Sequence, residues 1–285
     1  MRQVTAPGRW VWRASGLATV LALAVPGIWL ISTAGTSPNG AITVFPTQTI
    51  TVTQHVTSLN VRSYGAPVRV TAGPGYAVRV TGTIMFNQQN GGPPAVAASV
   101  SGGRLTLAAP SCAYSGCSVG FEVSVPAGVT VTAASDGGPV TVSGTEGASL
   151  DSGSGPVQAT GIDGPLTVTS DGGGVIVDGL TGPLHVDTGS GTLVAQGVAA
   201  ATATVITDGG GARISFVAAP DAVLVNTGSG AATLALPDGQ YAVTADSGGG
   251  PEQVEIATDP AASASVSVST GGGPLLIEPA GTGSG

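Results

Sequence analysis

The sequence predicts an all-β protein in which an N-terminal transmembrane helix is followed by a β-solenoid of stacked two-strand repeats. Three observations lead to this prediction. A repeat of 17 to 23 residues fills the second half of the chain, its flanks alternate between apolar and polar residues, and one long uncharged segment precedes it. Of the 285 residues, 47 are Gly and 8% are charged, but 42% are hydrophobic, which is enough apolar material for a folded chain.

Residues 14–34 form the uncharged segment, which is rich in Leu, Ala, Val and Ile. As a helix it is long enough to cross about 30 Å of hydrocarbon. Three Arg residues precede it and favour a cytoplasmic tail at residues 1–13, which makes the segment a retained signal-anchor and the rest of the chain extracytoplasmic. The alternative is a signal peptide cleaved near Ala34, because small residues end the segment, and the rest would then be secreted.

A hydroxyl residue recurs eight times in the second half, and each occurrence is taken as the origin of a repeat. The origins are Ser135, Ser152, Ser170, Thr188, Thr207, Thr227, Ser247 and Thr270. Three positions after each origin stands a glycine, which predicts a turn that needs a positive φ or a close backbone approach. These structural turn glycines are Gly138, Gly155, Gly173, Gly191, Gly210, Gly230, Gly250 and Gly273.

The flanks of each origin read as strands. Positions −4 and −2 are apolar in all eight repeats, and positions +5 and +7 are apolar except at Glu252. Each repeat should therefore form two short strands that cannot bury their own apolar face, so neighbouring repeats must stack. This predicts a solenoid rod of about eight repeats over residues 131–279, with a Gly/Ser tail at 280–285.

Aspartate alternates between repeats. The residue after the origin is acidic at Asp136, Asp171 and Asp208, and the residue before it is Asp151, Asp187 or Asn226 in the intervening repeats. A parallel solenoid does not require alternation, so an antiparallel β-meander or β-prism is kept as the alternative architecture. Calcium needs six to eight oxygens, and aspartates two rungs apart stand about 10 Å from each other. Turn chemistry explains the columns, and we expect no metal, no cofactor and a fold independent of calcium.

The first half is expected to contain a spacer at residues 35–47 and a β-rich cap, or the first rungs, at residues 48–130. Cys112 and Cys117 are the two cysteines of the chain. They lie four residues apart in a turn-like stretch, and an exported chain meets oxidising conditions, so we expect a local disulfide. The two histidines, His55 and His185, are far from this stretch, which argues against a zinc site.

Several stretches together resemble one bacterial family. They are the N-terminal span, the section through Cys112-Ala-Tyr-Ser-Gly-Cys117 and Val123-Ser-Val-Pro126-Ala-Gly128-Val129, and units such as Asp187-Thr-Gly-Ser-Gly191. They are similar to the putative-adhesin family of β-strand-repeat proteins of unknown function, and the resemblance covers nearly the whole chain. It implies a β-repeat fold displayed from a membrane, and no catalytic residues come with it.

Residue patterns give little support for catalysis. Asp246 to Pro251 resembles the nucleophile loop of trypsin-like proteases, but Ser247 is one of eight equivalent origins. His185 lies between two apolar positions and should face solvent. A glycan-active β-helix enzyme, which needs clustered carboxylates, is a minor alternative. After residue 35, five Arg stand against sixteen acids, a balance that opposes binding to nucleic acid.

We therefore expect a non-enzymatic, membrane-anchored, adhesin-like binding or structural module on the cell surface. Its partners would be the membrane, through the single span, and a cell-wall polymer or an envelope protein. The alternative is an envelope sensor or regulatory accessory protein that acts through a membrane partner. The cytoplasmic tail of residues 1–13 is too short to fold a signalling domain, which favours the first function.

Overall fold

The computed structural model describes residues 42–87, 96–109 and 118–281. This part of the chain is all-β, with 23 strands in two sheets and no helix. Accordingly, none of the described ranges contains a helix that could span a membrane. The predicted span at 14–34 and the predicted disulfide between Cys112 and Cys117 both lie outside these ranges.

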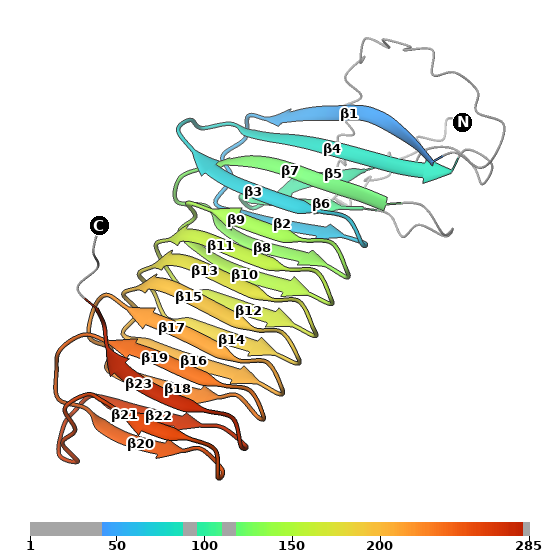
Figure 1. Cartoon of the computed structure of the whole chain (residues 1–285). Coiled ribbons are helices and arrows are strands. Elements are labelled where there is room, and N and C mark those ends of the chain that lie inside the picture. Colours follow the sequence, from blue (N-terminus) through green and yellow to red (C-terminus); the bar gives the residue numbers. More distant parts are fainter. Residues whose placement is uncertain (1–41, 88–95, 110–117, 282–285) are drawn as a thin grey trace, which may run out of the picture. The chain divides into compact units, whose positions relative to one another are not determined.

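Neighbouring strands in each sheet are hydrogen-bonded, and the spatial order differs from the chain order (Figure 1). Sheet A contains, in spatial order, β1 (Ile42–Val52), β4 (Val78–Asn87), β7 (Ser118–Pro126), β3 (Val68–Gly73), β9 (Val140–Ser143), β11 (Val157–Ile162), β13 (Val175–Leu180), β15 (Leu193–Val198), β17 (Ala212–Phe216), β19 (Ala232–Leu236), β23 (Leu275–Pro279) and β21 (Glu252–Val254). Sheet B contains β20 (Ala242–Asp246), β22 (Ser265–Ser269), β18 (Ala222–Asn226), β16 (Thr202–Thr207), β14 (Leu184–Thr188), β12 (Leu166–Ser170), β10 (Gly147–Ser152), β8 (Thr130–Ser135), β2 (Ser58–Ser63), β6 (Arg104–Ala108) and β5 (Ala97–Ser101).

Each predicted repeat forms one strand in sheet B and the next in sheet A. The strands of successive repeats pair in parallel and in register, so that Ser135 lies beside Ser152 and Ser152 beside Ser170. Among the described strands, antiparallel pairing occurs for β1 with β4, β4 with β7, and β5 with β6. The antiparallel meander or prism kept as an alternative is therefore wrong for the repeats.

The core lies between the two sheets and consists of the predicted apolar columns. Fourteen of the sixteen residues at positions −4 and −2 are buried; the exceptions, Val243 and Ala245, are half-buried in the edge strand β20. Strict alternation explains this pattern, since every second side chain of a strand points to the same face. Origin residues share that parity and are buried as well.

A second glycine column ends four consecutive strands of sheet A. Gly144, Gly161, Gly179 and Gly197 have φ values of 70, 60, 71 and 63°. The left-handed backbone shifts the alternation by one residue, so the next side chain turns back into the core. These side chains are Thr145, Ile162, Leu180 and Val198, all 0% exposed. Within the described residues, the Thr145 hydroxyl is the one buried side-chain polar atom without a hydrogen-bond partner.

Two further units of the same kind lie within residues 48–130. In the first, β2 and β3 place Leu59 and Val61 in the core, and Ser63 occupies the origin position. Ala66 stands where later repeats have glycine, which hid this unit in the sequence. The second unit, β6 with β7, stacks on the other side of β2 and β3.

The last two repeats exchange places in the stack. β22 and β23 pair directly with β18 and β19, whereas the earlier β20 and β21 form the outer edges of the two sheets. The reason is visible in β21, where Glu252 occupies an otherwise apolar inward position. An outermost unit leaves that carboxylate exposed, whereas an internal unit would have buried it. If the units stacked in chain order, the unit of Thr270, with β22 and β23, would be outermost. The observed order therefore differs from the one that the repeat suggests.

Candidate functional site

The turn glycines lie where consecutive units come closest. A Cβ built on Gly155, Gly173 or Gly191 would lie closer than 3.0 Å to the carbonyl oxygen of the equivalent glycine in the preceding unit. None of the eight glycines has a φ in the left-handed range. Of the two reasons that the sequence offers for this column, the structure therefore shows the close approach of backbones.

The buried origin hydroxyls close the same turns. Ser152 donates a hydrogen bond to the Gly155 carbonyl at 2.7 Å, and Thr188 donates one to the Gly191 carbonyl at 2.8 Å. Ser247 does the same with the Gly250 carbonyl at 2.7 Å. Since Ser247 repeats a turn contact made all along the stack, the structure gives it a structural explanation and no distinct role as a nucleophile.

The alternation of aspartate has a steric cause. Turns of the sequence Asp-Gly-Gly, here called Asp turns, occupy 136–138, 171–173 and 208–210, and Gly-Ser-Gly turns, here called Ser turns, occupy 153–155, 189–191 and 228–230. A Cβ on the first glycine of a Ser turn would lie closer than 3.0 Å to the carbonyl oxygen of the aspartate in the preceding Asp turn. The two turn types therefore alternate within a parallel stack, and alternation does not indicate antiparallel strands.

The acidic columns do not converge. Asp136, Asp171 and Asp208 are all exposed, and no group of three or more His, Cys, Asp or Glu side chains suitable for a metal ion is found among the described residues. Asp136 instead makes an ion pair with Arg62 at 3.8 Å. His185 is exposed on β14, between the buried Leu184 and Val186, as the alternation predicts.

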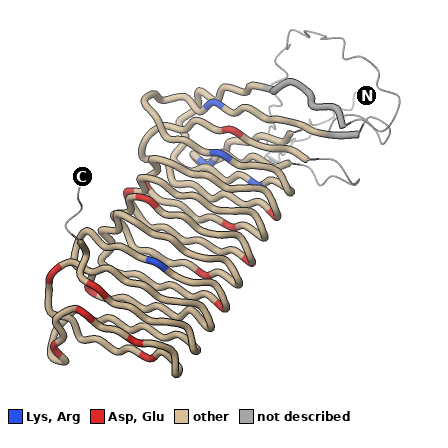
Figure 2. Tube along the Cα trace, in the orientation of Figure 1, with Lys and Arg blue, Asp and Glu red and all other residues tan. Residues whose placement is uncertain are grey.

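Charge is segregated along the stack (Figure 2). Four of the five arginines after residue 35, Arg62, Arg69, Arg79 and Arg104, belong to the first strands, where Glu122 is the single acid. The other fifteen acids lie between residues 136 and 278, together with one arginine, Arg213 on β17. The N-terminal units are thus locally basic although the protein is acidic.

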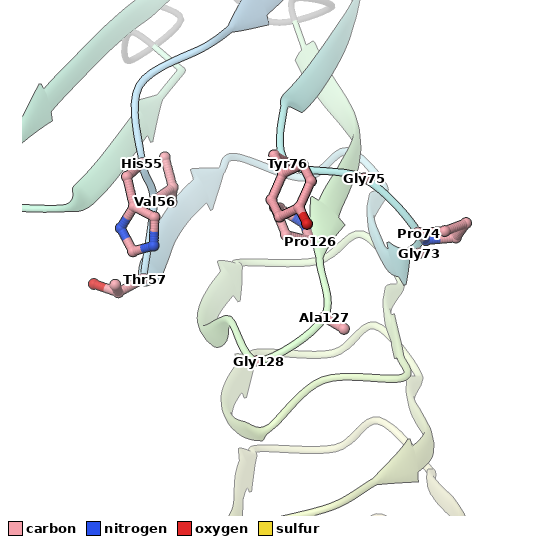
Figure 3. A pocket seen from close by; sticks show the side chains of 10 residues that line it. All are labelled: His55, Val56, Thr57, Gly73, Pro74, Gly75, Tyr76, Pro126, Ala127 and Gly128. Atoms are coloured by element: carbon pink, nitrogen blue, oxygen red, sulfur yellow. The ribbon is translucent and has the colours of Figure 1, made fainter.

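A pocket of about 450 Å³ lies at these basic units (Figure 3). Three connections line it: residues 55–57 between β1 and β2, residues 73–76 between β3 and β4, and residues 126–128 between β7 and β8. Tyr76 is 94% exposed, the largest exposed fraction among the exposed large hydrophobic side chains, and glycine and proline dominate the other walls.

The sequence pattern does not indicate this pocket, because its walls come from segments up to 73 residues apart, from His55 to Gly128. His55, which lies too far from the cysteines in sequence to suggest a zinc site, lines the pocket together with Thr57 and Tyr76. The local signal was Gly73-Pro74-Gly75-Tyr76, an aromatic residue on a tight turn.

No family model matches the chain, and no curated protein matches it. Solved structures with similar folds include a putative adhesin from Bacteroides fragilis, at 13% identity and a TM-score of 0.46, covering 84% of this chain and 98% of that one. A putative adhesin from Parabacteroides merdae has 13% identity and a TM-score of 0.44, covering 84% and 97%. A putative lipid binding protein from Parabacteroides distasonis has 9% identity and a TM-score of 0.39, covering 81% and 96%. TM-scores below 0.5 assign no function to this chain.

Proposed function

We propose that the chain is a membrane-anchored β-solenoid that displays a non-enzymatic, adhesin-like binding or structural surface outside the cell. In this proposal residues 14–34 are the retained anchor, and the stacked units carry the exposed surface. The uncharged apolar length of that segment and the arginines before it support the anchor. Parallel, in-register pairing of the repeats supports the solenoid.

One observation carries the proposal: the outward face of sheet B repeats nearly the same small polar side chains from unit to unit. In spatial order from β8 to β22, the row at position −3 reads Thr132, Ser149, Thr167, His185, Thr204, Leu224 and Ser267. Five of these seven residues carry hydroxyl groups. Strands about 4.8 Å apart thus present an extended row of hydrogen-bonding groups, which suits contact with a polymer or with another surface at many weak points.

Most of the strongly apolar residues are used inside the stack, where one core cluster runs from Val56 to Ile277. The units therefore provide a scaffold, and their outward side chains are free to vary without loss of the core. This division between a repetitive interior and a polar exterior is typical of repeat proteins that act through extended surfaces.

The proposal is tested by displaying the full chain on a bacterium that does not adhere and measuring its attachment to intact cell envelopes. We expect attachment to rise severalfold over cells that display the same anchor with an unrelated domain. The matched control is Val168→Asp, which places a carboxylate at a position that is 0% exposed and should unfold the stack. Equal attachment by all three strains would refute the proposal.

A further inference from the structure

The basic N-terminal units combine the pocket, the most exposed of the large hydrophobic side chains and four of the arginines. Ligand sites in proteins typically have volumes of roughly 300 to 1,000 Å³ and combine an apolar surface with a few polar groups. The pocket volume of about 450 Å³ lies in this range. Its lining offers the ring of Tyr76, the imidazole of His55, the hydroxyl of Thr57 and the open backbone of Gly73 and Gly75.

Tyr76 supplies an exposed aromatic ring at the pocket. Its side chain is 94% exposed, whereas Tyr241, another tyrosine of the described residues, is 1% exposed and donates its hydroxyl hydrogen bond to Pro237. An exposed ring combines an apolar surface with a polar tip, and such rings bind partners that have one apolar and one wet side. A sugar ring has this character, because its C–H groups form an apolar face and its hydroxyl groups surround that face.

The arginines near the pocket indicate that its ligand is negatively charged. Arg79 follows Tyr76 by three residues, and its strand partners are Thr51 and Ser124. Arg104 follows Gly103, whose carbonyl accepts a hydrogen bond from the pocket residue Thr57 at 2.8 Å.

The side chains of Arg79 and Arg104 are both exposed. Neither arginine faces an acidic residue across its ladder, since the partners of Arg104 are Ser58 and Ser101.

The other two arginines of this region already face acids. Arg62 makes the one ion pair found among the described residues, with Asp136, and its guanidinium also lies 5.7 Å from the centre of the Tyr64 ring. Arg69 lies opposite Glu122 in the ladder between β3 and β7. The arginines without an acid directly opposite are thus Arg79 and Arg104, which lie near the pocket residues Tyr76 and Thr57 along the chain or through Gly103, in a protein that is otherwise acidic.

We infer that this pocket binds a carboxylated sugar residue of an acidic polysaccharide. The sugar ring packs on Tyr76, its hydroxyl groups meet His55 and the backbone of the Gly-Pro-Gly turn, and its carboxylate is attracted by Arg79 and Arg104. The inference rests on the proposed surface function, for which it names one ligand class and one site. The acidic units beyond Asp136 repel the same polymer and so orient it towards the N-terminal units.

The test uses the full chain in a neutral detergent, with polygalacturonate as the acidic probe and a neutral galactan as the matched control. Retardation in gels that contain each polymer reports binding. We expect retardation by polygalacturonate alone, decreasing as salt rises, because exposed charges are screened. Tyr76→Ala should weaken binding about 10-fold, as truncation of a central aromatic anchor does, whereas Tyr76→Phe should keep it.

Variants that remove arginine charges test the electrostatic part of the inference. The double variant Arg79→Gln, Arg104→Gln should weaken binding about five-fold at low salt, with little effect at high salt. Arg213→Gln removes the same charge from β17 and should leave binding unchanged. Equal retardation by the galactan, full binding by Tyr76→Ala with an unchanged melting temperature, or displacement of the polymer by vesicles of anionic phospholipid would overturn the inference. Attachment of displayed cells that survives Tyr76→Ala would overturn the site and leave the proposed function standing.

Discussion

Gly173→Ala is the sharpest test of how closely the units stack. Its Cβ would lie closer than 3.0 Å to the carbonyl oxygen of Gly155, which belongs to the backbone and cannot rotate away. The neighbouring Gly172 belongs to the same turn and has no left-handed φ. A Cβ on Gly172 would meet its nearest atom, the Ser190 Oγ, at 3.5 Å, which is an ordinary contact.

The cost follows from the contacts that must be given up. If the turns separate to admit the methyl group, the bond from Gly172 N to Gly153 O at 3.0 Å and the bond from Asp171 N to Ser152 O at 3.2 Å are weakened. Two hydrogen bonds at about 1 kcal/mol each, added to part of an overpacking cost of about 1–3 kcal/mol, give a loss of about 3 kcal/mol in the free energy of unfolding. Gly172→Ala should raise the free energy of unfolding by about 0.5 kcal/mol, because the alanine lowers the entropy of the unfolded chain.

Thermal unfolding followed by far-ultraviolet circular dichroism separates the two variants. For a folded part of this size, a loss of 3 kcal/mol lowers the melting temperature by roughly 6–12 °C, and Gly172→Ala should melt within about 2 °C of the unaltered protein. Melting temperatures that agree within about 2 °C for the two variants would refute the argument that close backbone approach demands glycine at this position.

Four further outcomes are expected. Thr145→Val should raise the free energy of unfolding by about 1 kcal/mol, since it replaces a buried hydroxyl without a partner by a methyl group; denaturant titration measures this, and a decrease would contradict it. Thiol titration of protein recovered from the envelope should find Cys112 and Cys117 oxidised, with two free thiols as the contrary result. Chelator should leave the melting temperature unchanged, whereas a large fall reversed by calcium and not by magnesium would show a calcium-dependent fold. Intact-mass analysis should find residues 14–34 attached, and a mature chain that starts at Gly35 would show cleavage.

The strands and core of the repeats could be predicted because parity alone determines them. Leu166, Val168 and Ser170 share one face of a strand, and all three are buried. The alternation of side chains along a strand could not explain why Asp turns and Ser turns alternate. The change from Asp171 to Gly189 reflects contact between units that are neighbours in space. The sequence contains this alternation, but the distance between backbones that explains it appears only when the units are stacked.

The order of the units and the pocket were harder to predict. Glu252 breaks an apolar column of the sequence. This break alone does not place its unit at the outer edge, because that position also depends on how well the next repeat packs against β18 and β19. The first unit escaped detection because Ala66 replaced the expected glycine. The pocket joins three loops, and its position depends on the insertion of β2 and β3 between units that come later in the chain.

The steric rule at the turns also limits how such a chain can grow or shrink. An aspartate cannot follow directly on an Asp turn, because its Cβ would meet the carbonyl oxygen beneath it, as a Cβ on Gly153 would meet that of Asp136. Removal of residues 153–170 would stack Asp171 on Asp136, whereas removal of residues 153–188 would restore glycine there.

We therefore expect that a unit with a Ser turn cannot be lost alone from between two Asp turns, whereas it can be lost together with a neighbouring Asp turn. The melting temperatures of the two deletion variants test this rule, and a deletion of residues 153–170 as stable as the deletion of residues 153–188 would disprove it.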